Sequence, residues 1–347
     1  MVQRELAAGA LSRILLAEDP LARRPVVIKT LRWESVANEN VAFCLARLDR
    51  QAQTGGRLAH PHLVKVFDRG SDFLVLEYLQ GLSLSTILRD RGRMDVDEAL
   101  RVLAPLAAAL DHMHARGVVH RDVRPANVVV LADGSPKLID FGASCLMNRP
   151  LEAWDRLLGT PAHMAPEQVL HGTASALTDV FSLGVLAYEM ITGEAPFRGD
   201  SVGSITYRLV YEPAAPPSRK VDGLPRVYDE IFARALAKEP ERRLTSAGAF
   251  VRALQGGRER CRTPTAEALE EQRRDLASLK LSLPGSDAEG CVVEVKTQPE
   301  GAQVLWNGVE RGLTPLRICE TSPGPHSLTL RHEGYAPVEA AFVIPAA

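Results

Sequence analysis

Three oxygen-bearing side chains near the middle of the chain have a spacing that could bring them to one place. Asp122 and Asn127 lie in the run HRDVRPAN at residues 120–127, and Asp140 follows thirteen residues after Asn127. Two apolar runs around an Asp-Gly turn separate them, which predicts a β-hairpin over residues 128–139. That hairpin places all three side chains at one mouth. A carboxylate there could meet a hydroxyl group, and an amide and a carboxylate could hold Mg²⁺, which prefers oxygen ligands.

The order and spacing of these residues resemble the catalytic loop and metal-binding turn of the protein kinase family, in particular the bacterial Hanks-type serine/threonine kinases. The resemblance covers residues 4–254. It implies an α+β, bilobal fold with a β-rich N-terminal lobe and a helical C-terminal lobe. It also implies transfer of the γ-phosphoryl group of Mg·ATP to hydroxyl groups of proteins, with ATP and Mg²⁺ as cofactors and proteins as substrates.

The resemblance assigns a role to each polar residue of the catalytic segment. Asp122 positions the substrate hydroxyl and accepts its proton. Arg124 stands where serine/threonine kinases usually have lysine, and its guanidinium neutralises charge on the γ-phosphate. Asn127 and Asp140 bind the metal. Thr160 contacts Asp122 and favours serine or threonine as the acceptor.

The resemblance also predicts a buried frame around the catalytic segment. Glu167 should form an ion pair with Arg243, and Asp179 should hold the backbone of the catalytic loop. His120 and Phe141 are expected to pack against each other. A capping box, Asp95 with Glu98, predicts the start of a long helix.

The nucleotide site is expected mostly in the N-terminal lobe. Lys29 ends the apolar run VVIK, and by resemblance it contacts the α- and β-phosphates. Ile14 and Val27 border the adenine, and Leu76 closes the back of the pocket. The backbone groups of Glu77 and Leu79 form hydrogen bonds with the adenine edge. Besides Lys29, the residues that the resemblance implies for nucleotide binding are Gly9, Ile14, Val27, Leu76, Glu77, Leu79 and Val129.

The loop before Lys29 departs from the family pattern. Ala7, Gly9 and Ser12 stand where the family has three glycines. A side chain at such a position restricts the backbone and holds its N–H groups away from the phosphates. We therefore expect a stiffer loop that lies further from the nucleotide.

The following helix departs as well. Gln51 replaces the glutamate that normally pairs with the strand lysine, and a neutral hydrogen bond is about half as strong as a charge-assisted one. Glu39 or Asp49 could substitute for it, although neither is at the matching position. Gly55-Gly56 follows, and each glycine costs about 1 kcal/mol in a helix interior. We therefore expect a poorly formed or mobile helix.

The segment after the metal-binding turn offers little for phosphorylation to act on. Residues 143–159 contain a single hydroxyl group, that of Ser144, directly beside the turn. Kinases that are switched by phosphorylation of this loop need an acceptor nearer its middle. We expect Glu152 and Asp155 to supply constant negative charge instead.

Bulk properties agree with a cytoplasmic protein that binds no nucleic acid. The 347 residues carry a formal charge of −2, so there is no basic footprint for a nucleic acid. The five cysteines lack metal-site spacing and are typical of reduced thiols. There is no signal peptide and no apolar run near the roughly 18 residues of a transmembrane segment.

The remaining quarter of the chain changes character. A linker with one charged helix over 265–283 is expected in residues 256–290, and this helix could be a solvated spacer or a dimerising element. Short strands separated by Gly/Pro turns predict a small all-β sandwich over 291–347. Its Pro299-Glu300-Gly301-Ala302 run resembles the PEGA family, which implies an interaction module with a protein or cell-envelope ligand. The catalytic domain is then residues 1–255.

Two other functions compete with the kinase. A pseudokinase scaffold would explain Ala7, Ser12 and Gln51, which all weaken phosphate binding or lysine pairing, and also the Gly55-Gly56 pair in the helix. A small-molecule phosphotransferase of the aminoglycoside type shares the H-x-D-x-x-x-x-N loop. The run Ala165-Pro166-Glu167, which resembles a protein-docking segment, and Arg243 argue against that third reading.

Overall fold

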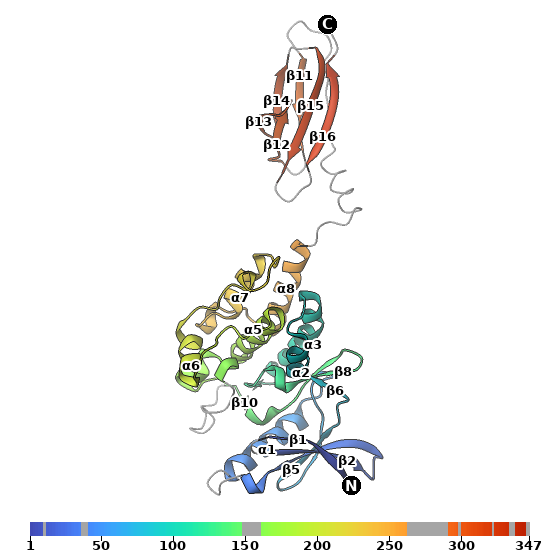
Figure 1. Cartoon of the computed structure of the whole chain (residues 1–347), viewed down its shortest axis with the longest axis vertical. Coiled ribbons are helices and arrows are strands. Elements are labelled where there is room, and N and C mark those ends of the chain that lie inside the picture. Colours follow the sequence, from blue (N-terminus) through green and yellow to red (C-terminus); the bar gives the residue numbers. More distant parts are fainter. Residues whose placement is uncertain are drawn as a thin grey trace. The chain divides into compact units, whose positions relative to one another are not determined.

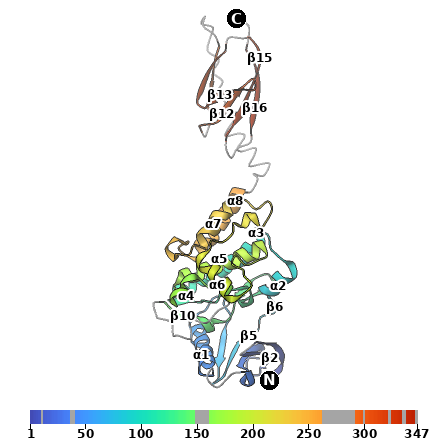
Figure 2. The same cartoon turned by 60° about the vertical axis from the view of Figure 1, so that its left-hand side comes forward.

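The chain divides into two compact units, Met1–Cys261 and Arg262–Ala347, which are described separately. Figures 1 and 2 show the elements of each in a computed structural model. The described residues are 1–9, 12–35, 41–147, 161–261, 291–297, 300–320, 323–332 and 337–344.

The N-terminal lobe is an antiparallel sheet with one long helix packed on it (Figure 2). Strand order is β1-β2-β3-β5-β4. Register places Ile14 opposite Lys29 and Val27 opposite Leu76, so the predicted adenine and phosphate contacts share neighbouring strands. The elements are β1 (Val2–Ala8), β2 (Ser12–Asp19), β3 (Arg24–Leu31), α1 (Val41–Arg57), β4 (Val66–Arg69) and β5 (Phe73–Glu77).

Helix α1 is continuous through both of its glycines, so the prediction of a poorly formed helix is wrong. Gly55 is buried, and a Cβ atom there would overlap with Cγ2 of Val66 on β4. The same Cβ would lie 3.6 Å from Cδ2 of Phe141. Close packing of the helix on β4 therefore outweighs the low helix propensity of glycine, and this packing requires a residue without a side chain.

The C-terminal lobe is built from helices around α5, whose residues are almost all buried. Helix α3 begins at the predicted capping box, with Asp95 Oδ1 accepting from Glu98 N at 2.7 Å. The helices are α2 (Leu84–Arg91), α3 (Val96–His114), α4 (Pro166–His171), α5 (Ala176–Thr192), α6 (Val202–Tyr211), α7 (Val227–Ala235) and α8 (Ala247–Cys261) (Figure 1).

Short strands join the lobes and carry the predicted hairpin. Strands β8 (Val128–Leu131) and β9 (Pro136–Leu138) pair antiparallel, which confirms it, and β6 (Gly81–Ser83) pairs with β8. A second small sheet joins β7 (Val118–Val119) to β10 (Cys145–Leu146). The segment before β4 is tied to the hairpin, because Val64 N donates to Leu138 O at 3.0 Å. These elements confirm the bilobal α+β fold.

The second unit is a small sandwich of two antiparallel sheets, which confirms the predicted all-β domain. Val293 and Ile318 of the smaller sheet share one apolar core with Trp306 and Leu328 of the larger sheet. The smaller sheet holds β11 (Cys291–Val295) and β14 (Leu316–Glu320), and the larger holds β13 (Val309–Leu313), β12 (Gln303–Trp306), β15 (Gly324–Arg331) and β16 (Val338–Ile344).

The helix expected over 265–283 lies outside the described residues, and the domain limits given above stay a prediction. Among the helices that the structure describes, none combines the length and apolar character needed to span a bilayer.

Candidate active site

A buried carboxylate in the first turn of α5 holds the backbone of the catalytic loop. Asp179 accepts hydrogen bonds from the backbone N–H groups of His120 and Arg121, both at 2.8 Å. Its Oδ2 also lies 2.7 Å from Nε2 of His114 on α3. Burial alone would raise the pKa of Asp179, but His114, the His120 charge and the His120 amide lower it overall. The expected hold on the loop backbone is therefore confirmed.

Asp122 is oriented by its neighbours in the same loop. Asn127 Nδ2 donates to the backbone carbonyl of Asp122 at 2.8 Å and to its Oδ2 at 2.7 Å. The Nε of Arg124 lies 3.2 Å from Oδ1. The structure thus brings Asp122, Arg124 and Asn127 together. Because Asn127 uses its nitrogen for Asp122, its amide oxygen keeps its lone pairs for a cation.

Lys29 reaches across from β3 to the metal-binding turn. Its Nζ lies 2.8 Å from Oδ1 of Asp140 and donates to Oε1 of Gln51 at 3.0 Å. Asp140 is in the left-handed region, with φ of 65°, and its Oδ1 also accepts from Gly142 N at 3.1 Å. Burial would raise the pKa of Asp140, but the Lys29 charge and hydrogen bond hold it well below its usual range.

Asp49, one of the two substitutes considered for the missing glutamate, pairs with another residue instead of Lys29. Asp49 forms an ion pair with Arg69 at 2.6 Å, and both of these side chains are about half exposed. Glu39 lies outside the described residues. Gln51 is therefore the helix partner of Lys29, at 3.0 Å, and its side chain is buried.

The donor set suits Mg²⁺. Asn127 and Asp140 offer one amide oxygen and one carboxylate, and the hydrogen bonds and ion pair of Asp140 use Oδ1, which leaves Oδ2 for a cation. Mg²⁺ is commonly held by one or two carboxylates or amides together with water and phosphate oxygens. These residues therefore fit a metal that is shared with a nucleotide.

The adenine end of the site involves a contact that sequence reasoning missed. Lys137 Nζ on β9 donates to both carboxylate oxygens of Glu77, each at 2.8 Å. This ion pair joins the end of β5 to the strand that leads into the metal-binding turn. The two residues are 60 positions apart, so no local pattern could have indicated it. Leu79 follows and packs against the main core.

Two other predicted site residues lie in separate elements. Gly9 turns from β1 to β2, with its N–H donating to Ser12 O at 2.8 Å. Val129 lies on β8, opposite Ser83 and Lys137. Thr160, Glu152 and Asp155 lie outside the described residues.

The buried frame is confirmed. Arg243 Nη1 and Nη2 donate to the two carboxylate oxygens of Glu167 at 2.8 and 2.7 Å. Thr178 Oγ1 adds a third bond to Glu167 at 2.9 Å. His120 and Phe141 pack edge to face, with ring centroids 5.7 Å apart. All of these side chains are buried, so the frame holds the catalytic segment from the core side.

Ser144, the single hydroxyl of residues 143–159, is fully buried. Its Oγ donates to Phe141 O at 2.6 Å and lies 3.0 Å from Oγ1 of Thr54 on α1. The hydroxyl is therefore part of the packing between α1 and the metal-binding turn.

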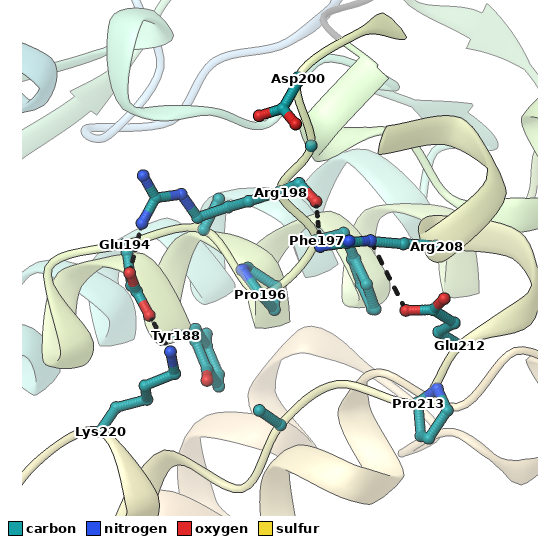
Figure 3. Close-up of a pocket in the computed structure, with 13 residues that line it drawn as sticks. Tyr188, Glu194, Pro196, Phe197, Arg198, Asp200, Arg208, Glu212, Pro213 and Lys220 are labelled. Carbon is teal, nitrogen blue, oxygen red and sulfur yellow. Dashed lines mark hydrogen bonds and ion pairs between the residues drawn. The ribbon is translucent and has the colours of Figure 1, made fainter. Parts of the chain in front are cut away.

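A cavity of about 480 Å³ lies among the helices of the C-terminal lobe (Figure 3). Five of its six charged side chains pair with one another. Glu194 bridges Lys220, at 2.6 Å, and Arg198, while Arg208 lies 3.7 Å from Glu212. None of the predicted catalytic, nucleotide or metal residues lines it.

Comparison with known families decides what this arrangement is. The protein kinase domain family matches residues 1–254, and the PEGA domain family matches residues 291–344. The chain belongs to the protein kinase family. Its kinase domain therefore covers the two lobes described above, and both predicted resemblances are confirmed.

The relatives of this kinase domain are bacterial. Serine/threonine-protein kinase PknB of Mycobacterium tuberculosis (strain ATCC 25177 / H37Ra) is 36% identical over 253 residues, which cover 70% of this chain and 40% of PknB. PknL of M. tuberculosis (strain CDC 1551 / Oshkosh) is 36% identical over 252 residues, 71% of this chain and 62% of PknL. PknB of Mycobacterium leprae (strain TN) is 35% identical over 252 residues, with 70% and 40% covered. The chain thus spans less than two thirds of these curated relatives.

Proposed function

We propose that this chain is a serine/threonine protein kinase that transfers the γ-phosphoryl group of Mg·ATP to hydroxyl groups of proteins. The observation that supports this best is the convergence of Lys29 on Asp140, at 2.8 Å, beside a catalytic loop whose Asp122 is oriented by Asn127. Family membership supports the same reaction, because protein kinases use ATP and Mg²⁺.

Each residue then has a definite task. Asp122 orients the substrate hydroxyl for in-line attack and takes its proton, while Asn127 keeps the carboxylate in position. Lys29 turns from Asp140 to the α- and β-phosphates when nucleotide binds, and Arg124 offsets charge on the transferred group. Bound Mg²⁺, held by Asn127 and Asp140, supplies further neutralisation of phosphate charge.

The nucleotide lies between Ile14 and Val27 on one side and Val129 on the other. The backbone of Glu77 and Leu79 pairs with the adenine edge, and Leu76 closes the back of the pocket. The backbone turn at Gly9 faces the phosphates. By its place in the family pattern, Thr160 is expected to contact Asp122 and to favour serine or threonine acceptors.

We also propose that the PEGA domain is an interaction module for a protein or a cell-envelope ligand.

A cytoplasmic location is proposed as well. The buried thiol of Cys44, whose pKa is raised by burial, agrees with that setting.

A pseudokinase scaffold is the second candidate. It is favoured by Gln51, which offers Lys29 a neutral partner, and by Ala7 and Ser12 in the phosphate loop. In that reading the Lys29–Asp140 ion pair is a resting contact that Mg·ATP does not displace productively.

The test uses the whole chain and an Asp122→Asn variant. We expect Mg·ATP to raise the Tm of both proteins equally, because Asp122 does not hold the nucleotide. Incorporation of ³²P from labelled ATP into serine and threonine of a generic basic protein should fall about 100-fold or more in the variant. A Tm shift without incorporation by the wild-type protein would reject the enzyme and favour the scaffold.

A further inference from the structure

Helix α1 faces the active site with two polar residues, and the proposed reaction uses only one of them. Gln51 accepts the hydrogen bond from Lys29, and Arg47 lies one helical turn earlier on the same face. Both side chains line a cavity of about 70 Å³ whose wall also includes Lys29, Asp140 and Gly142. Arg47 therefore points to the place where the metal-binding turn meets the lysine.

The Arg47 guanidinium lies beside Gly142 of that turn. An ideal Cβ atom built on Gly142 would be 3.3 Å from Nε of Arg47 and 3.5 Å from its Nη2. The group is also 5.9 Å from the ring centroid of Phe43, one turn back on α1. These distances place the Arg47 side chain between Phe43 of α1 and the metal-binding turn.

Charge explains why α1 needs a second contact. Gln51 is neutral, so position 51 gives α1 no ionic link to Lys29. Lys29 is paired with Asp140 instead, at 2.8 Å. Arg47 lines the same cavity as the Asp140 carboxylate, and a guanidinium keeps its charge at any working pH.

We propose that Arg47 is a positioning residue for the metal-binding turn: it holds Gly142 and Asp140 against α1 and so replaces the link that a glutamate at position 51 would form. The inference rests on the proposed kinase function for its catalytic consequence, but its structural content is the coupling of α1 to the turn. Two side chains, Gln51 and Arg47, then share a task that normally falls to one ion pair.

The experiment is a double-mutant cycle with Arg47→Met, which keeps the unbranched stem, and Gln51→Glu, alone and together. Arg57→Met, an exposed site in the last turn of the same helix, is the matched control. Three quantities are measured: amide hydrogen exchange of residues 41–57, the Mg²⁺ concentration for half of the ATP-induced Tm shift, and kcat with KM for protein substrate.

We expect Arg47→Met to speed exchange in α1 about tenfold, to raise the half-maximal Mg²⁺ severalfold and to lower kcat about tenfold with KM unchanged. In the Gln51→Glu background each effect should shrink below about threefold, because the introduced carboxylate restores an ionic link to Lys29. Gln51→Glu alone should raise kcat severalfold. Arg47→Lys should recover part of the loss.

Two outcomes would overturn the proposal: Arg47→Met behaving like Arg57→Met, or Arg47→Met causing the same losses in both backgrounds. Hydrogen exchange does not depend on phosphoryl transfer. A wild-type protein without kinase activity would therefore refute the proposed function, while the exchange data would still decide for or against Arg47.

Discussion

The two lobes hold their active-site residues by different physical means. In the C-terminal lobe, buried charged side chains hold them in place. Asp179 holds the catalytic loop, and Glu167 forms a bidentate ion pair with Arg243. In the N-terminal lobe, the side chain that α1 offers to Lys29 is the neutral Gln51, and the helix rests on β4 through Gly55.

This difference separates what fixes the fold from what tunes the chemistry. A buried ion pair costs several kcal/mol to break, because each partner left alone is an uncompensated charge. The hydrogen bond from the charged Lys29 to the neutral Gln51 contributes about 1.5–3 kcal/mol net, so it holds α1 less firmly than a buried ion pair would. The catalytic loop of this chain is therefore held in one geometry, whereas the position of α1 responds to single substitutions.

The largest effect should come from the buried frame. Arg243→Met leaves the Glu167 carboxylate buried without its partner and also removes bonds to the carbonyls of Ala237 and Leu177. We expect a loss of about 3–5 kcal/mol in the free energy of unfolding. The measurement is urea unfolding followed by circular dichroism.

Arg242→Met is the matched control, because the neighbouring side chain is exposed and its contact with Glu239 is 3.5 Å long. It should change stability by less than about 0.5 kcal/mol. If both variants lost the same amount, the contrast between a charge-fixed and a loosely fixed lobe would be unsupported.

Most active-site features of the C-terminal lobe could be predicted from the sequence, because their residues lie in recognisable runs. The catalytic loop lies in the run from His120 to Asn127, and the metal-binding turn in the run from Asp140 to Gly142. The hairpin between them follows from an Asp-Gly turn. The Asp95 capping box is likewise a local pattern. Each of these features depends on spacing along the chain, so each could be predicted.

The contacts that the sequence did not reveal all join distant segments. Lys137 with Glu77, and Arg47 with Gly142, have no local signature. For Gly55, local propensity pointed the wrong way, because the decisive neighbour is Val66 on another strand. Intrinsic helix propensity, worth about 1 kcal/mol at a glycine, is readily overridden by tertiary packing.

The two glycines of α1 test that packing directly. Gly55→Ala places a methyl group into Val66 in a packed core, and overpacking of this kind costs about 1–3 kcal/mol. Part of that loss is offset by alanine's better helix propensity. We expect net destabilisation of about 1 kcal/mol, measured by urea unfolding, together with lower kinase activity because α1 shifts from Lys29.

Gly56→Ala provides the control, because no heavy atom lies within 4 Å of a Cβ at that position. It should stabilise the chain by up to about 1 kcal/mol through helix propensity alone. Equal stabilisation by both alanines would mean that α1 does not depend on close contact with β4.

The smallest effect concerns the seam between the lobes, where His60 precedes β4 and His112 lies on α3. Their ring centroids are 5.1 Å apart, and Arg116 Nη1 lies 3.2 Å from Nδ1 of His112. Burial is the first cause that lowers the pKa of both histidines, and for His112 the Arg116 charge is the second. The neutral rings are therefore favoured in the folded chain.

The sign of the pH effect follows from these lowered values. An unfolded histidine has a pKa of about 6.5, so below that pH the unfolded chain binds protons that the folded chain resists. Stability is present above about pH 6.5 and is lost as the pH falls through the lowered folded pKa. His112→Gln should therefore lose less Tm between about pH 7.5 and 5.5 than the wild type. His171→Gln, at the exposed end of α4, should match the wild type. A wild-type response from His112→Gln would show that the titration of this seam does not set the pH dependence of stability.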